Sequence, residues 1–223
     1  MRQSLSIMLA LPAVAAAQTV SAAIPSRLNP RDPAVIYGED LGSAEQAVTQ
    51  FGICTLNRDR NEVQALLDLP VDSRRYDSRL RGVVSEDCLA EGSIVIPPEI
   101  LRGSLFEALY LEKYRRFDPP LAQVRYDYAA GYNKPLSKSA AAALSLVSVG
   151  DCVVRAQPAA SRNFILNAST TAVGSRALAL IISALPPCVF QGNQVHFSRP
   201  IVRAAVAEAL YRLTSQAAKA GMQ

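Results

Sequence analysis

Apolar residues recur at helical spacing through the first half of the chain. The pattern predicts four successive helices, over residues 43–58, 59–70 and 73–89 and from residue 98 onward. Ser43 and Asp59 stand where side chains cap helix starts, and Pro70 stands where a proline would end the second helix. The β-prone run at 93–96 is too short to form a sheet by itself. The first half therefore predicts an all-α fold.

The second half repeats this pattern. Helices are expected over residues 140–155, 157–168 and 174–185 and from about residue 200 to the end. Between the halves, residues 117–139 hold three prolines and three of the eight tyrosines, Tyr126, Tyr128 and Tyr132. Such a composition is typical of an ordered connector rather than a flexible tether. We expect these tyrosines to cover the seam between two helical units, or else to form a contact surface.

One stretch occurs twice in closely similar form. Residues 100–110 read ILRGSLFEALY and residues 201–211 read IVRAAVAEALY. The repeat defines unit 1 as residues 43–116 and unit 2 as residues 140–218, two tandem units of three to four helices each that are expected to pack together. Both copies keep an arginine, a glutamate and a tyrosine, which are Arg102, Glu107 and Tyr110 in unit 1 and Arg203, Glu208 and Tyr211 in unit 2.

The repeated arginine, glutamate and tyrosine are candidate structural or ligand contacts. Arg102 and Glu107 lie about 140° apart around a helix, so they do not simply pair with each other. We expect each arginine to donate to carbonyls at the end of a neighbouring helix and each tyrosine hydroxyl to find a buried acceptor. A ligand pocket lined by the triplet is the alternative. Glu208 and Arg212 have the spacing of a surface ion pair, whereas unit 1 has Leu111 at the arginine position.

The four cysteines follow the same repeat. Cys54 and Cys152 each follow a glycine by two positions, and Cys88 and Cys188 each begin a C-x-x-x-G run. The economical pairing is Cys54 with Cys88 and Cys152 with Cys188, one disulfide in each unit. Each disulfide would close a loop of about 35 residues and contribute roughly 3–4 kcal/mol. No cysteines have the close spacing of a metal or redox motif, so no metal site is expected.

The first 22 residues have the layout of a secretory signal peptide. Arg2 precedes an apolar run and a small-residue stretch that ends at Ala17, and a second acceptable cleavage site follows Ala22. The run is well short of the ~20 residues that a membrane span requires. Residues 23–42 would then form an N-terminal extension. We expect a bacterial protein that is periplasmic or secreted, where disulfides form.

Composition narrows the function classes. A hydrophobic content of 50% with 19% charged residues is typical of a globular protein. The net charge of +4 is too small to indicate binding to nucleic acid. The longest later apolar stretch, residues 177–190, is interrupted by two prolines. We therefore do not expect an integral membrane protein.

Motifs of catalysis and cofactor binding are scarce. The only histidine is His196, and no G-x-S-x-G, phosphate-loop, H-E-x-x-H or EF-hand pattern occurs. No catalytic residue and no cofactor is therefore expected. A glycosidase needs only two carboxylates, for which Glu107 and Glu208 would be the candidates.

Three motifs of unit 2 resemble those of a group of small exported proteins of alphaproteobacteria, particularly sphingomonad-like ones. The motifs are VGDCVVR, CVFQG and VRAAVAEALYR, at residues 149–155, 188–192 and 202–212. Proteins of that group carry one or two copies of a G-x-C-V-V-R unit that ends in an R-x4-E-A-L-Y helix. The resemblance covers about residues 43–215 and is weaker in unit 1, which has ICTLNR in place of the C-V-V-R run. It implies a bacterial envelope location and implies no activity.

The sequence favours a non-enzymatic exported helical protein that acts by contact, as an envelope accessory or binding module whose partner is a protein or an envelope component. Two alternatives stay open. One is a hydrolase that acts on an envelope polymer through carboxylates, which would need a cleft with converging acids of perturbed pKa. The other is a binder of a small apolar ligand, which would need a closed pocket between the two units.

Overall fold

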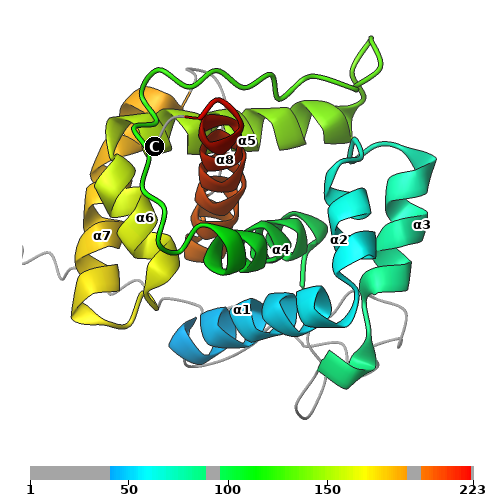
Figure 1. Cartoon of the computed structure of the whole chain (residues 1–223), viewed down its shortest axis with the longest axis horizontal. Coiled ribbons are helices and arrows are strands. Elements are labelled where there is room, and N and C mark those ends of the chain that lie inside the picture. Colours follow the sequence, from blue (N-terminus) through cyan, green and yellow to red (C-terminus); the bar gives the residue numbers. More distant parts are fainter. Residues whose placement is uncertain (1–40, 89–95, 190–196, 222–223) are drawn as a thin grey trace, which may run out of the picture. The chain divides into compact units, whose positions relative to one another are not determined.

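The computed structural model describes residues 41–88, 96–189 and 197–221, and within them all regular structure is helical (Figure 1). The all-α prediction is therefore confirmed. The chain runs through α1 (Leu41–Arg58), α2 (Arg60–Leu67), α3 (Arg74–Val83), the 3-10 turn η1 (Glu86–Cys88), α4 (Pro98–Lys113), α5 (Lys138–Ala156), α6 (Pro158–Leu166), α7 (Ala172–Ala184), the 3-10 turn η2 (Pro186–Cys188) and α8 (Arg199–Lys219).

Several helix boundaries differ from the sequence-based expectation; α2, for example, ends at Leu67 and not at Pro70. Helix α1 begins at Leu41, so Ser43 lies inside the helix and is not its N-cap. Helix α3 ends at Val83, and the turn η1 follows where the pattern predicted a helix through residue 89. Apolar periodicity continues across this break, which is why the pattern missed it. The expected signal peptide, most of the expected N-terminal extension, three residues of the β-prone run and His196 lie outside the described residues.

Side-chain caps explain where several helices start. Asp59 accepts a hydrogen bond from the backbone N–H of Glu62 at 3.1 Å, as the sequence predicted. Ser73 caps α3 in the same way, and Thr171 caps the corresponding helix α7. The second half thus repeats the first helix by helix, from α5 to α8.

Each unit is closed by its own disulfide. Cys54 of α1 is bonded to Cys88 of η1, and Cys152 of α5 is bonded to Cys188 of η2, with a Cα–Cα distance of 5.6 Å in both. This is the pairing that the repeat predicted. Each disulfide ties the 3-10 turn of its unit to the long first helix of that unit.

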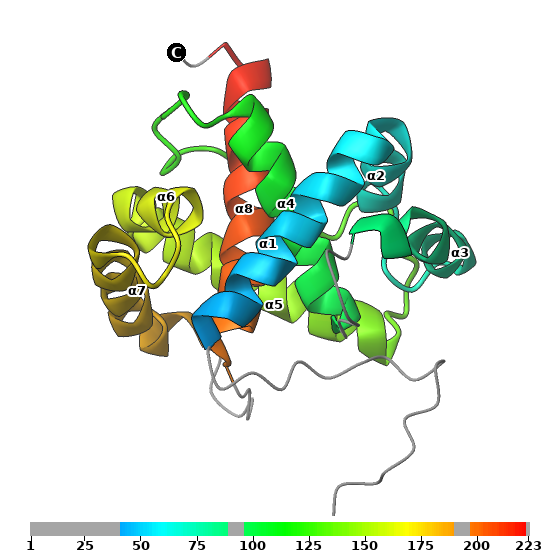
Figure 2. The ribbon, with the colours of Figure 1, turned by 90° about the horizontal axis from the view of Figure 1, so that it is seen from below.

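The repeated helices α4 and α8 pack against each other at the centre (Figure 2). Helix α1 lies against α4 and α5 lies against α8, while α2 and α3 are on one side and α6 and α7 on the other. All ten residues from Leu101 to Tyr110 are buried, including the charged ones. An apolar stripe was expected on this helix, and the structure instead buries it on all sides.

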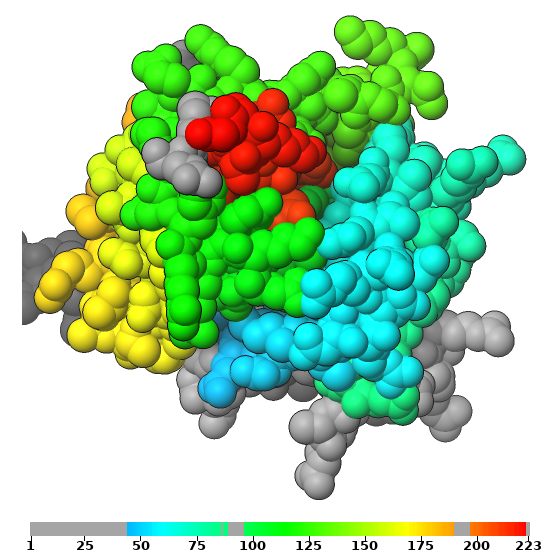
Figure 3. All heavy atoms as spheres, viewed as in Figure 1, coloured from blue at the N-terminus to red at the C-terminus, as the bar shows by residue number. Residues whose placement is uncertain are grey.

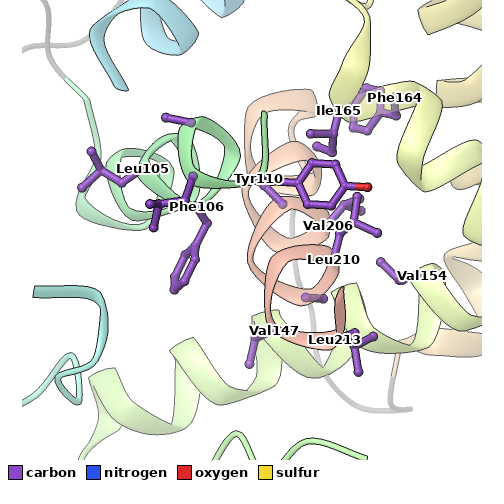
Figure 4. Packing of buried hydrophobic residues seen from close by; sticks show 14 of the residues in the cluster. Leu105, Phe106, Tyr110, Val147, Val154, Phe164, Ile165, Val206, Leu210 and Leu213 are labelled. Carbon is purple, nitrogen blue, oxygen red and sulfur yellow. The ribbon is translucent and has the colours of Figure 1, made fainter. Parts of the chain in front are cut away.

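Both units contribute to one hydrophobic cluster (Figure 4). Phe106 and Tyr110 of α4 and Val206 and Leu210 of α8 lie within it, together with Phe164 of α6. The two sequence repeats are therefore not two separate cores in the described residues.

Helix α5 is the one helix in the described ranges that is long and apolar enough to cross a membrane, by length and composition alone. The sequence pattern had pointed to residues 177–190 as the longest apolar stretch, but α5 is the longer helix and has only three charged residues, Lys138, Asp151 and Arg155. Its residues Val147, Val153 and Val154 are buried in the shared cluster, and Cys152 carries the disulfide. These contacts build α5 into the helical core.

Helices α4 and α8 approach closely at Gly103. A Cβ atom added there would lie 2.2 Å from the Cβ of Ala204, which is the residue that corresponds to Gly103 in unit 2. Such a distance is far below van der Waals contact. The two helices therefore cross at equivalent positions, and one of the two residues must be glycine.

We predict that Gly103→Ala lowers the free energy of unfolding by about 1–3 kcal/mol, because the added methyl group pushes the central helices apart. Adding Ala204→Gly should restore most of the lost stability, since the double variant again has one alanine and one glycine at the crossing. Chemical denaturation followed by circular dichroism measures both effects. As a control, Gly82→Ala on an open face of α3 meets nothing within 4 Å and should not destabilise the protein. Additive losses in the double variant would contradict the proposed crossing contact.

Candidate binding site

The repeated arginines and glutamates form two ion pairs that cross between the units. Arg102 donates from Nε to Glu208 Oε2 at 3.2 Å and from Nη2 to Oε1 at 3.1 Å. Arg203 donates from Nε to Glu107 Oε2 at 2.9 Å and from Nη2 to Oε1 at 2.8 Å. The arginine of each unit therefore binds the glutamate of the other through a two-pronged contact. Spacing along one helix could not reveal this arrangement.

Each arginine also reaches the end of a neighbouring helix, as the sequence suggested. Arg102 Nη2 donates to the carbonyl of Leu67 at 3.1 Å, at the end of α2. Arg203 Nη2 donates to the carbonyl of Ile165 at 3.2 Å, near the end of α6. These carbonyls lack partners within their own helices, so the arginines satisfy them.

The two repeated tyrosines have different surroundings. The Tyr110 hydroxyl accepts a hydrogen bond from Arg162 at 3.0 Å, so in this contact it is itself the acceptor. Tyr211 packs by its ring, with centroid distances of 5.5 Å to Phe106 and 5.7 Å to Tyr114. Burial raises the pKa of Tyr211 to about 12. The expectation of a buried acceptor for each tyrosine hydroxyl thus stays a prediction, and the residues around the two rings differ between the units.

Glu208 lies between two guanidinium groups. Besides Arg102, Arg212 donates from Nε to Glu208 Oε1 at 2.9 Å, and the Arg212 and Glu208 side chains are only 16% and 15% exposed. This pair was expected at the surface and is instead mostly enclosed. Burial by itself raises the pKa of Glu208, but the positive charges of Arg102 and Arg212 outweigh it, so the pKa is lowered.

The connector (residues 117–139) is tied to both units by its three tyrosines. Tyr126 accepts a hydrogen bond from Arg212 of α8, and Tyr128 donates to Asp151 of α5 at 2.9 Å. The Tyr132 hydroxyl accepts from the backbone N–H of Val71, after α2, at 3.5 Å. The tyrosines thus connect elements of unit 1 and unit 2.

Arg155 holds the start of the connector. Its guanidinium group donates to the backbone carbonyls of Leu121, Ala122 and Val124, and it forms an ion pair with Asp151 at 2.6 Å. Figure 3 shows the surface beside this region, where the end of α8 is flanked by α4, α2 and the connector. Arg155 belongs to the VGDCVVR motif, but the sequence did not predict this role, because an arginine four residues after an acid is common on helix surfaces.

A cavity of ≈340 Å³ lies where the connector meets the central ion pair. It is lined by Asp68, Leu69, Pro70, Arg102, Tyr126, Asp127, Tyr128, Ala130, Gly131, Tyr132, Ala143, Leu144, Val147, Glu208 and Arg212. The structure therefore brings Arg102 and Glu208 to one cavity, together with all three connector tyrosines. Glu107 and Arg203 instead line a hollow of only ≈20 Å³.

A larger hollow adjoins this cavity at the connector. It measures ≈620 Å³ and is lined by Ala122, Arg125, Tyr126, Asp127, Tyr128, Ser148, Asp151 and Arg155. In the described residues no group of three histidine, cysteine, aspartate or glutamate side chains is placed to hold a metal ion. The chemistry that the site presents is hydrogen bonding, charge and aromatic contact.

Comparison with protein families, curated proteins and solved structures found no match for this chain. The fold and the site define its class as an all-α, disulfide-bonded protein of two repeated units. Its site must therefore be interpreted from its own contacts.

We predict that Glu208→Gln lowers the free energy of unfolding at pH 7 by about 3–5 kcal/mol, because it leaves two enclosed guanidinium groups without their carboxylate. The pKa of Glu208 in the folded protein is below its ordinary 4.5. Its contribution is therefore fully present above that value and is lost as the pH falls through the folded pKa.

The difference between the native protein and Glu208→Gln should thus shrink below a pH of about 4.5. Denaturant unfolding at a series of pH values measures it. The exposed Glu99→Gln in the first turn of α4 is a matched control that should change stability little at any pH. The account would be contradicted if the native protein and Glu208→Gln differed in free energy of unfolding by the same amount at every pH down to acid unfolding.

Proposed function

We propose that the chain is an exported bacterial protein that acts without catalysis, by binding a protein or another envelope component through its connector. The observation that carries this proposal is the fixing of the connector tyrosines. Tyr126, Tyr128 and Tyr132 are each held by a polar contact, and all three stay partly exposed. Rigid, half-exposed tyrosines lose little conformational entropy when they bind a partner.

The hollow beside the connector has the composition of a contact surface. Tyr126 and Tyr128 lie with ring centroids 4.9 Å apart, and Arg125 and Arg155 line the same hollow. Tyrosine and arginine are the residue types enriched in protein interfaces and in their energetic centres. This supports contact with a partner over the binding of an apolar small molecule.

Export is supported by the disulfides. Two disulfides are typical of oxidising compartments such as the periplasm and the cell exterior, because cytosolic thiols are kept reduced. The signal-like first 22 residues agree with this location.

One observation favours the hydrolase alternative, because Glu208 shares its cavity with Asp68 and Asp127. The state of Glu208 speaks against it. Its two oxygens accept hydrogen bonds from Arg102 and Arg212, and its pKa is lowered, whereas an acid catalyst needs a raised pKa. Breakdown of purified cell-wall or capsule polymer by the native protein, lost in Asp68→Asn or Asp127→Asn, would establish the alternative.

A photo-crosslinking residue at position 125 tests the contact surface. We expect crosslinks to one dominant species in intact cells from position 125 in the connector. Position 176 on α7 is the matched control, because it is also an exposed arginine but lies away from the connector. Equal crosslinking from both positions, or none from position 125, would overturn the proposed contact surface.

Export has its own test. All four cysteines should resist alkylation in protein taken from the periplasm or the medium, and deletion of residues 1–22 should retain the chain in the cytoplasm with reactive thiols. Mass spectrometry after alkylation counts the modified thiols. Free thiols in the exported protein would contradict the proposed location.

A further inference from the structure

The surroundings of the two crossed arginines differ at one place. Arg203 has a further charged partner, Glu45 of α1, whose Oε1 lies 3.1 Å from Nη1 of the arginine. Glu45 is buried, and it accepts hydrogen bonds from the backbone N–H of Ser169 at 3.3 Å and from the Ser169 hydroxyl. The chain thus supplies a second carboxylate of its own to Arg203.

Ala143 of α5 stands at the position that corresponds to Glu45. The spacing that relates Gly52 to Gly150 and Cys54 to Cys152 also relates residue 45 to residue 143. Both glycines lie against the backbone of the central helix of their own unit, α4 or α8, so the register also holds in space. Unit 2 therefore has a methyl group where unit 1 has a carboxylate.

The space next to Arg102 is open where the space next to Arg203 is filled. Ala143 and Arg102 line the cavity of ≈340 Å³, whereas the hollow at Glu45 and Arg203 measures ≈20 Å³. The buried Nη1 of Arg102 has no hydrogen-bond partner among the described residues. The corresponding Nη1 of Arg203 lies 3.1 Å from Glu45 and also donates to the carbonyls of Phe164 and Asn167. Of these three partners only Glu45 is a side chain, and Ala143 replaces it in unit 2, so the charged group absent beside Arg102 is a carboxylate.

The charges of the cavity favour a ligand that also carries a cation. The lining holds the carboxylates of Asp68, Asp127 and Glu208 and the guanidinium groups of Arg102 and Arg212. Glu208 is already bonded to both arginines, while Asp68 and Asp127 are exposed. A simple anion would meet these two acids, whereas an ammonium group on the same ligand would be attracted to them.

We propose that this cavity binds a small zwitterion, an amino acid or a dipeptide. Its carboxylate lies beside Arg102 as the Glu45 carboxylate lies beside Arg203, and its ammonium group faces Asp68 and Asp127. The inference goes beyond the proposed contact function and does not depend on it, because it is argued from Arg102 and Ala143, which are not connector residues.

The rest of the cavity suits the body of such a ligand. Leu144, Val147 and the tyrosine rings of the connector provide apolar wall. The volume of ≈340 Å³ lies at the lower end of the range for small-molecule sites, about 300–1,000 Å³. A free amino acid and a dipeptide are both within this size, so the two sources are separated by experiment.

Isothermal titration calorimetry with the disulfide-bonded protein tests the ligand class. The probes are L-leucine and L-alanyl-L-alanine, each beside its carboxamide, and 4-methylpentanoate, which is leucine without its ammonium group. We expect at least one of the two zwitterions to bind, its carboxamide to bind at least ten-fold more weakly and 4-methylpentanoate to bind more weakly than leucine. Whether leucine or the dipeptide binds better identifies the source. The absence of binding by both zwitterions at millimolar concentration, or equal binding of the carboxamides, overturns the proposal.

Ala143→Glu tests the site itself. The new carboxylate would take the place of the ligand carboxylate, so zwitterion binding should fall at least ten-fold. Ala142→Glu is the matched control, since residue 142 is the exposed neighbour on the same helix and its variant should bind as the native protein does. Ala143→Gln has the same volume without the charge, so Ala143→Glu should melt at a higher temperature than Ala143→Gln if it pairs with Arg102. Native-like binding by Ala143→Glu, or a lower melting temperature than that of Ala143→Gln, overturns the correspondence between the two arginine sites. These results are independent of crosslinking at position 125.

Discussion

The close crossing of α4 and α8 is the constraint on which the rest of the structure depends. Because Gly103 lies against Ala204, the two helices come near enough for each arginine to reach the glutamate of the other unit. A buried ion pair adds little net stability once its desolvation is counted, but it is costly to break. The crossed pairs therefore contribute most by excluding other arrangements of the two units. Any rotation or sliding of one central helix on the other would leave charged groups unpaired in the interior.

The same crossing organises the proposed contact surface. It places Glu208 between Arg102 and Arg212, and Arg212 in turn holds Tyr126 of the connector. The connector is thus fixed to the centre of the molecule by a chain of charged contacts and not by its own secondary structure. Its tyrosines keep defined positions although no helix in the described residues includes them. Glu208 thus links the central helices to the proposed contact surface, beside the ties that Arg155 and Asp151 make to the connector.

Local features of the sequence predicted the fold well. Helix starts at Asp59 and the proline-bounded start of α4 depend on residues next to each other in the chain, so they can be derived from the sequence. The repeat also indicated the cysteine pairing, because duplicated spacing leaves one economical choice. The crossed ion pairs could not be derived, since they depend on how the units face each other. The true start of α1 at Leu41 was missed because Ser43, two residues later, is also a plausible N-cap.

The site was only partly visible in the sequence. Arg102 and Glu208 were recognised as candidates because they recur, while Asp68, Asp127 and Arg155 carry no repeated signal. Glu45 could have been found, since aligning the units places a carboxylate opposite Ala143 and marks a position where the copies differ in charge. In this protein the residues that both units share form the crossed ion pairs. The positions at which the units differ distinguish the surroundings of Arg102 from those of Arg203.

The glycine and alanine at the crossing also bear on how such a molecule can be assembled from identical parts. If two separate single-unit chains associated through this contact, the same amino acid would face its own copy across it. Two alanines would clash there, so a self-associating single-unit protein would need glycine on both chains. Joining the units in one polypeptide removes that requirement. It also allows Glu45 to lie beside Arg203 while Ala143 stands at the corresponding position of unit 2. Covalent linkage is thus what permits the two halves to become chemically different.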